Sequence, residues 1–202
     1  MNARASNLNL PNILTLLRIA AVPVLILLLL SGSREAGFWA AAVFSLAAVT
    51  DWLDGYLARK FSIVTILGKF LDPLADKLVV MAALIMIIPY GRVPAWAVFL
   101  MLGREMVITG LRSIASSEGI VIAASDLGKY KTVFQMVAII GLLLHYPYYW
   151  FFGIQWEIFH VSMHNVGIFF FYISLALTLW SGWDYLWKFM RLILRGDRDV
   201  ER

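Results

Sequence analysis

Cysteine is absent from the 202 residues of this chain, and charged side chains are scarce. The absence of cysteine excludes disulfides, thiolate metal sites and cysteine nucleophiles. Charged residues make up 15% of the chain and hydrophobic residues 61%, whereas an ordinary soluble domain has about 25% and 45–50%. A core of this size cannot hide that excess, because a chain of this length buries only about 70% of its surface. The composition therefore excludes a soluble globular protein and a disordered one, and it indicates a membrane protein.

In place of charge, the chain has a series of long apolar runs. A membrane-spanning helix needs about 20 mostly apolar residues. Six stretches come near that length: 13–30, 36–57, 71–89, 94–114, 130–149 and 166–188. We expect the first to be a membrane helix and not a removable signal, because further apolar stretches follow it and Arg18 lies inside it. The sequence predicts a single-domain, all-α integral membrane protein over 1–202, with six transmembrane helices, a lead-in at 1–12 and a basic tail at 189–202.

Lysine and arginine are divided unevenly between the breaks that separate these runs. The first and third breaks hold Arg34 and Arg92, and the fifth, 146–165, holds neither residue type. The termini and the second and fourth breaks hold most of the others. Since cytoplasmic loops carry this excess, we expect both termini to be cytoplasmic. The net charge of +4 reflects this topology and not a nucleic-acid partner.

Two pairs of acids flank the second cytoplasmic break. These are Asp51, Asp54, Asp72 and Asp76. At 100° per residue, each pair shares one helix face with a glycine, Gly55 or Gly68. Charged groups in a membrane domain are costly and usually functional, and carboxylate-only ligands suit Mg²⁺ or Mn²⁺, a pair of which clamps phosphate oxygens. Solvated helix ends would account for one such pair, but they give no reason for two matched pairs with glycines in phase.

Basic residues follow in the fourth and fifth apolar runs. Arg104 and Arg112 lie in the fourth run, and Lys129 and Lys131 lie at the start of the fifth. An intramembrane arginine is costly unless it is paired or faces a polar cavity. Its planar fork matches phosphate oxygens, and a helix N-terminus attracts anions. We expect a phosphate cradle that faces the acids; the alternative is that Arg104 pairs structurally with Glu105 and the lysines only mark the cytoplasmic side.

The pattern Asp51-x2-Asp54-Gly55-x2-Ala58-Arg59-x8-Gly68-x3-Asp72-x3-Asp76 resembles the complete signature of the CDP-alcohol phosphatidyltransferases, with every fixed position present. Segments 12–18, 71–77, 103–105, 111–112 and 127–135 resemble the bacterial branch of that family whose acceptor is glycerol 3-phosphate. The resemblance covers about residues 10–140. It implies six membrane helices, a polar cavity on the cytoplasmic side and a homodimer.

The resemblance also implies a role for each residue of the signature. The four aspartates would hold two divalent cations, Mg²⁺ or Mn²⁺, and Asp76 would be the general base. Gly55, Ala58, Arg59 and Gly68 would line the site for the cytidine diphosphate part of the donor. Arg104, Arg112, Lys129 and Lys131 would bind the phosphate of the acceptor.

The implied reaction moves the phosphatidyl group of CDP-diacylglycerol to glycerol 3-phosphate, giving phosphatidylglycerophosphate and CMP in a bacterial inner membrane. Its partners would be both substrates, membrane lipids and a second copy of the chain. Phosphatidylglycerol, inositol phosphate or serine is the alternative acceptor. A divalent-cation transporter fits less well because the acids gather at one end of the spans, and a non-catalytic scaffold leaves the aspartate–glycine pattern unexplained.

Two features are left open by the sequence. Arg18 either extends toward the cytoplasmic surface or contacts the site. His145, His160 and His164 are expected on the far side of the membrane from the acids, in a structural or interfacial role.

Overall fold

The computed structural model describes residues 10–61, 66–117, 127–146, 150–151, 154–155 and 162–200. Within these ranges the chain forms α1 (Leu10–Leu30), α2 (Arg34–Phe61), α3 (Ile66–Met86), α4 (Ala95–Ser117), α5 (Leu127–Leu144), β1 (Trp150–Phe151), β2 (Ile154–Gln155) and α6 (Met163–Val200). The strands pair antiparallel, Trp150 with Gln155 and Phe151 with Ile154. Apart from this small hairpin, the regular structure of the described ranges is helical, which confirms the all-α prediction.

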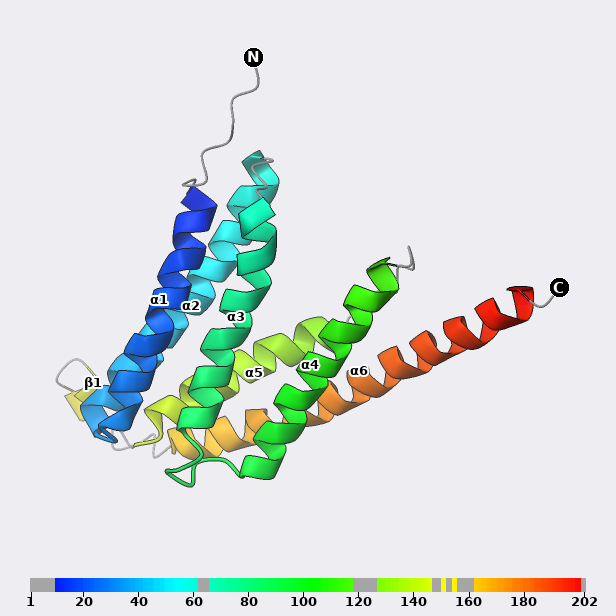
Figure 1. Ribbon diagram of the computed structural model, residues 1–202. Coiled ribbons are helices and arrows are strands. Elements are labelled where there is room, and N and C mark those ends of the chain that lie inside the picture. The colour runs from blue at the N-terminus through cyan, green and yellow to red at the C-terminus, as the bar shows by residue number, and fades with distance from the viewer. Residues whose placement is uncertain are drawn as a thin grey trace, which may run out of the picture.

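The helices form two groups, and the main contact between the groups is that of α2 with α5. Helix α1 packs against α2 and α3, and α6 packs along α5 and against α4. Helix α2 contacts α5 and so connects the groups. Figure 1 shows α1, α2 and α3 running side by side, while α6 crosses beneath α4 and extends past it toward the C-terminus. The connections at 31–33 and 87–94 lie at one end of the molecule, and the start of α1 and the end of α6 lie away from that end (Figure 1).

Several helix boundaries differ from those predicted. Helix α3 begins at Ile66 and not near 71, so Pro73 lies inside the helix. A proline removes one backbone hydrogen bond, and a helix can continue through it with a kink. Helix α5 ends at Leu144 and not at 149, because Pro147 disfavours a helical conformation for the residue before it and His145 has a positive φ of 30°.

The predicted basic tail is part of a helix over most of its length. Helix α6 continues from the predicted span through residues 189–200 to Val200. Nothing in this stretch imposes a break, because it contains no proline and its arginines are good helix formers.

Two helices in the described ranges are long and apolar enough to cross a membrane: Asn12–Leu30 in α1 and Met163–Leu192 in α6. Tyr130–Leu144 in α5 is apolar but shorter. Helix α4 carries Arg104, Glu105 and Arg112 within its apolar run. Large apolar side chains are exposed on the outer surface, including Phe99 (74%) and Trp183 (71%), as expected of a surface that faces lipid.

Close helix packing depends on glycine where α5 meets α6. A Cβ atom added to Gly141 would lie 2.9 Å from the Cα of Gly167. A Cβ atom added to Gly167 would lie 2.7 Å from the backbone nitrogen of Leu142. Real Cβ atoms do not approach backbone this closely, so both positions require glycine for the helices to meet.

The end of the molecule that holds the connections at 31–33 and 87–94 also holds a buried cation. Arg92 is 3% exposed and donates hydrogen bonds to the carbonyl oxygens of Leu142 and Leu143, at 3.0 and 3.2 Å. These are orphan carbonyls at the end of α5, so Arg92 caps that helix. Nearby, Nδ1 of His145 lies 3.0 Å from Nδ1 of His164. His145 lies just after α5 and His164 lies at the start of α6, so their contact joins the ends of the two helices.

Candidate active site

Three of the predicted acids lie on two neighbouring helices that share α1 as a partner. Asp51 is on α2, and Asp72 and Asp76 are one turn apart on α3. Thr15 of α1 donates a hydrogen bond to Oδ1 of Asp72 at 2.5 Å. Arg18 of α1 forms an ion pair with Asp51. The first helix therefore supplies a polar partner to each acid-bearing helix, which agrees with its packing against both.

Arg18 is the buried member of its ion pair. Its side chain is 2% exposed, whereas that of Asp51 is 42% exposed. Asp76 lies within electrostatic range of both residues. The positive charge of Arg18 thus offsets the mutual repulsion of the carboxylates around it. Of the two roles that the sequence left open for Arg18, the structure favours contact with the site.

The other five residues of the signature pattern lie on the same two helices. Asp54, Gly55, Ala58 and Arg59 fall within α2, and Gly68 falls within α3, but their side chains lie outside the described part of the structure. Where side chains are described, no three acidic or histidine residues gather closely enough to hold a metal ion. The two-cation site therefore stays a prediction. Its chemistry fits the carboxylates present, because an all-oxygen donor set suits Mg²⁺ or Mn²⁺.

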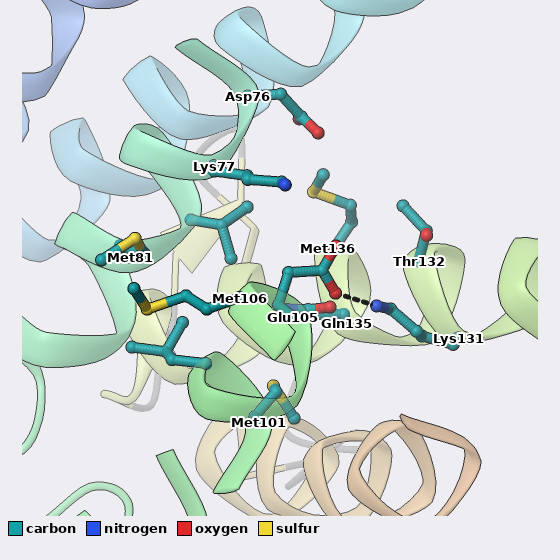
Figure 2. A pocket seen from close by; sticks show the side chains of 12 residues that line it. Asp76, Lys77, Met81, Met101, Glu105, Met106, Lys131, Thr132, Gln135 and Met136 are labelled. Carbon is teal, nitrogen blue, oxygen red and sulfur yellow. Dashed lines mark hydrogen bonds and ion pairs between the residues drawn. The ribbon is translucent and has the colours of Figure 1, made fainter. Parts of the chain in front are cut away.

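A pocket with about 550 Å³ of empty space opens beside Asp76, between α3, α4 and α5. Its polar lining consists of Asp76, Lys77, Glu105, Lys131, Thr132 and Gln135. Figure 2 shows Asp76 and Lys77 entering from one wall, with Glu105, Lys131 and Thr132 across the space from them. Methionines make up much of the remaining wall.

Asp76 stands between this pocket and a smaller cavity. The second cavity has about 210 Å³ of empty space and is lined by Arg18 of α1 and Phe44 of α2, among others. Both spaces share Asp76, Val80 and Met136 as walls. The Asp76 carboxylate is therefore accessible from the pocket and close to the Arg18 side of the acid group.

Glu105 forms ion pairs with two basic side chains. Its Oε2 atom is ion-paired with Lys131 of α5, as the dashed line in Figure 2 marks, and lies 3.3 Å from Nη1 of Arg104. The Lys131 side chain is 8% exposed. Lys77 donates to Oγ1 of Thr109, one helical turn beyond Glu105 on α4. From the sequence, Glu105 was expected only as a partner of Arg104, and Lys77 had no predicted role.

The predicted phosphate cradle is divided between two places. Lys131 lines the pocket. Arg104 turns toward α6, where its Nη2 atom donates to Oγ of Ser181 at 2.9 Å. The guanidinium of Arg112 lies over the ring of Tyr185, also on α6, at 5.8 Å from the ring centroid. The Lys129 side chain lies outside the described part of the structure, so the cradle as a whole stays a prediction.

Comparisons with known proteins agree with the sequence pattern. Residues 8–180 match the CDP-alcohol phosphatidyltransferase family. A Bacillus subtilis protein named CDP-diacylglycerol–glycerol-3-phosphate 3-phosphatidyltransferase is 40% identical over 192 residues, which cover 89% of this chain and 94% of the relative. Relatives of the same name from Rickettsia bellii and Haemophilus influenzae are 44% and 37% identical. The match to the Rickettsia bellii protein covers 67% of this chain and 75% of that relative. The match to the Haemophilus influenzae protein covers 88% of this chain and 91% of that relative.

Proposed function

The chain belongs to the CDP-alcohol phosphatidyltransferase family, and we propose that it transfers the phosphatidyl group of CDP-diacylglycerol to glycerol 3-phosphate. The products are phosphatidylglycerophosphate and CMP. The observation that carries this proposal is the likeness, over most of both chains, to relatives named for that reaction. The pocket supports it, because carboxylates and cations line the same space.

The aspartates are the proposed binding group for divalent cations. Asp51, Asp54, Asp72 and Asp76 would hold Mg²⁺ or Mn²⁺ through carboxylate oxygens. Bound there, two such ions would neutralise the diphosphate of the donor and the charge that develops on CMP. Thr15 and Arg18 orient two of these carboxylates, since each contacts one of them.

Asp76 is the proposed general base. It borders the pocket and so can meet an acceptor that enters there. Its carboxylate takes the proton of the sn-1 hydroxyl of glycerol 3-phosphate. That oxygen attacks the phosphorus that carries the diacylglycerol group, and the bond from this phosphorus to CMP breaks. Positioning of the reactants supplies much of the rate enhancement in such a transfer.

Cations on the far wall of the pocket are the proposed partners of the acceptor phosphate. Lys131 already lines the pocket, and Arg104, Arg112 and Lys129 lie on the same two helices. A phosphate monoester carries a charge of about −1.5 to −2 at pH 7 and has three acceptor oxygens. It therefore competes well with the single carboxylate of Glu105 for the ammonium group of Lys131.

The donor is proposed to bind from the membrane side. Gly55, Ala58, Arg59 and Gly68 would line the site for its cytidine diphosphate part, and its acyl chains would stay in the bilayer. We propose that the six helices lie in a bacterial inner membrane with both termini and the pocket facing the cytoplasm, and that the protein is a homodimer. The exposed apolar side chains and the uneven division of lysine and arginine support this arrangement.

An acceptor panel tests the proposed reaction. Purified protein is given CDP-diacylglycerol and Mg²⁺ or Mn²⁺, and CMP release is measured with glycerol 3-phosphate, phosphatidylglycerol, inositol phosphate or serine. Of the four acceptors, we expect only glycerol 3-phosphate to cause CMP release. Release with a different acceptor would replace the proposed substrate, and divalent-ion flux in proteoliposomes without CMP release would replace the proposed reaction.

A further inference from the structure

The side chain of Arg104 is held by α6. Its Nη2 atom donates to Oγ of Ser181 at 2.9 Å, across the contact between α4 and α6. Ser181 is 4% exposed, and its hydroxyl in turn donates to the carbonyl of Leu177 at 2.7 Å. The hydroxyl is therefore fixed by its own helix, and it presents an acceptor to the guanidinium in a site with little access to water.

The neighbouring residue, Gly182, leaves the space that the stem of Arg104 occupies. A Cβ atom added to Gly182 would lie 2.8 Å from Cγ and 3.0 Å from Nε of Arg104. Contacts this short force the arginine side chain to move. Gly110 on α4 is different, because an added Cβ there meets nothing within 4 Å. The two glycines therefore form a matched pair, one with a packing requirement and one without.

A continuous set of polar contacts runs from Ser181 to the pocket. Arg104 contacts Ser181 through Nη2 and Oε2 of Glu105 through Nη1. The same oxygen of Glu105 is ion-paired with Lys131, which lines the pocket. The position of Arg104 against α6 thus helps to fix the carboxylate that orients Lys131.

We propose that Ser181 and Gly182 are positioning residues for the acceptor side of the reaction. Through Arg104 and Glu105, they fix the positions of the basic side chains that bind the acceptor phosphate. Helix α6 itself contributes none of the pocket's polar lining among the described residues. The inference rests on the proposed function. It adds that part of the acceptor specificity comes from a helix outside the signature pattern of acids and glycines.

The steric part of the inference is tested with Gly182→Ala, with Gly110→Ala as the control. Initial rates of CMP release are measured while glycerol 3-phosphate and CDP-diacylglycerol are varied separately. We expect Gly182→Ala to raise the KM for glycerol 3-phosphate about tenfold, the size expected for a lost hydrogen bond to a charged group. The KM for the lipid donor should stay within about twofold, and Gly110→Ala should match the parent protein. Equal changes in both KM values, or none, would overturn the inference.

The hydrogen-bonding part is tested with Ser181→Ala, which removes the acceptor without adding bulk. The control is Ser174→Ala on the same helix, where a fully buried hydroxyl donates to the carbonyl of Phe171 at 2.8 Å. Ser181→Ala should raise the KM for glycerol 3-phosphate selectively, and Ser174→Ala should not. If Gly182→Ala does not fold, this pair decides the question, and an unchanged acceptor KM in Ser181→Ala would refute the inference.

The parent protein distinguishes failure of this inference from failure of the proposed function. If the parent releases no CMP with glycerol 3-phosphate, the proposed function is wrong and the positioning inference fails with it. If the parent is active and Ser181→Ala and Gly182→Ala behave as their controls do, only the positioning inference fails.

Discussion

The buried guanidinium of Arg18 on α1 is paired with the half-exposed carboxylate of Asp51 on α2. The pair joins the first helix to the acids that we propose as cation ligands. A buried arginine that lost this partner would carry an uncompensated charge, which is costly. The contact therefore ties the stability of the first helix to the electrostatics of the site.

Replacement of Arg18 by glutamine should make stability depend more strongly on divalent cations. With EDTA, we expect a loss of about 1.5–3 kcal/mol from the removed charge-assisted hydrogen bond. Without the arginine the acids repel one another, and a bound Mg²⁺ ion would offset this repulsion. Added Mg²⁺ should therefore restore part of the lost stability. Thermal unfolding in detergent with and without Mg²⁺ measures both effects. Arg191→Gln, at an exposed position on α6, is the control, and an Arg18→Gln variant that behaves like it would contradict this reading.

Removal of divalent cations should abolish transfer. We expect EDTA to stop CMP release and added Mg²⁺ or Mn²⁺ to restore it, because the four aspartates proposed as ligands would offer the all-oxygen donor set that such cations prefer. A titration of CMP release against free metal concentration makes this test. Full activity in EDTA, after exhaustive dialysis against the chelator, would rule out the proposed role of the aspartates.

The sequence predicted the helices better than their contacts. Each apolar run corresponds to one helix of the described ranges, and the predicted run 36–57 correctly extends α2 past Asp51. In α4 the charged residues Arg104, Glu105 and Arg112, which belong to the predicted acceptor side of the site, interrupt the apolar run. Helix ends were less predictable, because Pro73 is tolerated inside α3.

Partner choice within the site could not be predicted, because it depends on how the helices pack. From the sequence, Arg104 and Lys131 were both predicted to bind the acceptor phosphate. In the structure Lys131 lines the pocket and Arg104 lies against α6. Gly182 carried no signal of its own, since glycine is common in membrane helices. Its role becomes visible only through the position of the arginine beside it.

The contact between α5 and α6 should not tolerate a side chain at Gly167. We expect Gly167→Ala to lower the unfolding free energy by about 1–3 kcal/mol, the usual cost of overpacking, because its Cβ would meet the backbone of Leu142. Gly110→Ala, with open space around it, should be neutral or slightly stabilising. Thermal unfolding of the two variants in the same detergent tests this, and equal midpoints would show that the helices separate without cost.

Lowering the pH should reduce the folding stability of the protein through His145. This residue follows the last residue of α5, and burial, with the nearby charges of Arg92 and His164, holds its pKa below the ordinary value of 6.5. The unfolded chain therefore binds a proton more readily than the folded one, so this contribution to stability is full above about pH 6.5 and is lost as the pH falls toward the lowered pKa. Unfolding midpoints between about pH 7.5 and 5 measure the slope.

His145→Asn should flatten that slope. Asparagine tolerates the positive φ of 30° at this position and does not titrate. A variant with the same pH dependence as the parent would assign the acid sensitivity to other groups.

The most direct test of the account is CMP release by Asp76→Asn. The variant keeps the size of the side chain but cannot accept the proton of the acceptor hydroxyl, and its protein must first be shown to fold by its thermal unfolding midpoint. With CDP-diacylglycerol, glycerol 3-phosphate and Mg²⁺, we expect kcat to fall by about 10²- to 10⁴-fold, the usual contribution of a general base. Normal CMP release by folded Asp76→Asn would contradict the central claim that phosphatidyl transfer takes place at this carboxylate.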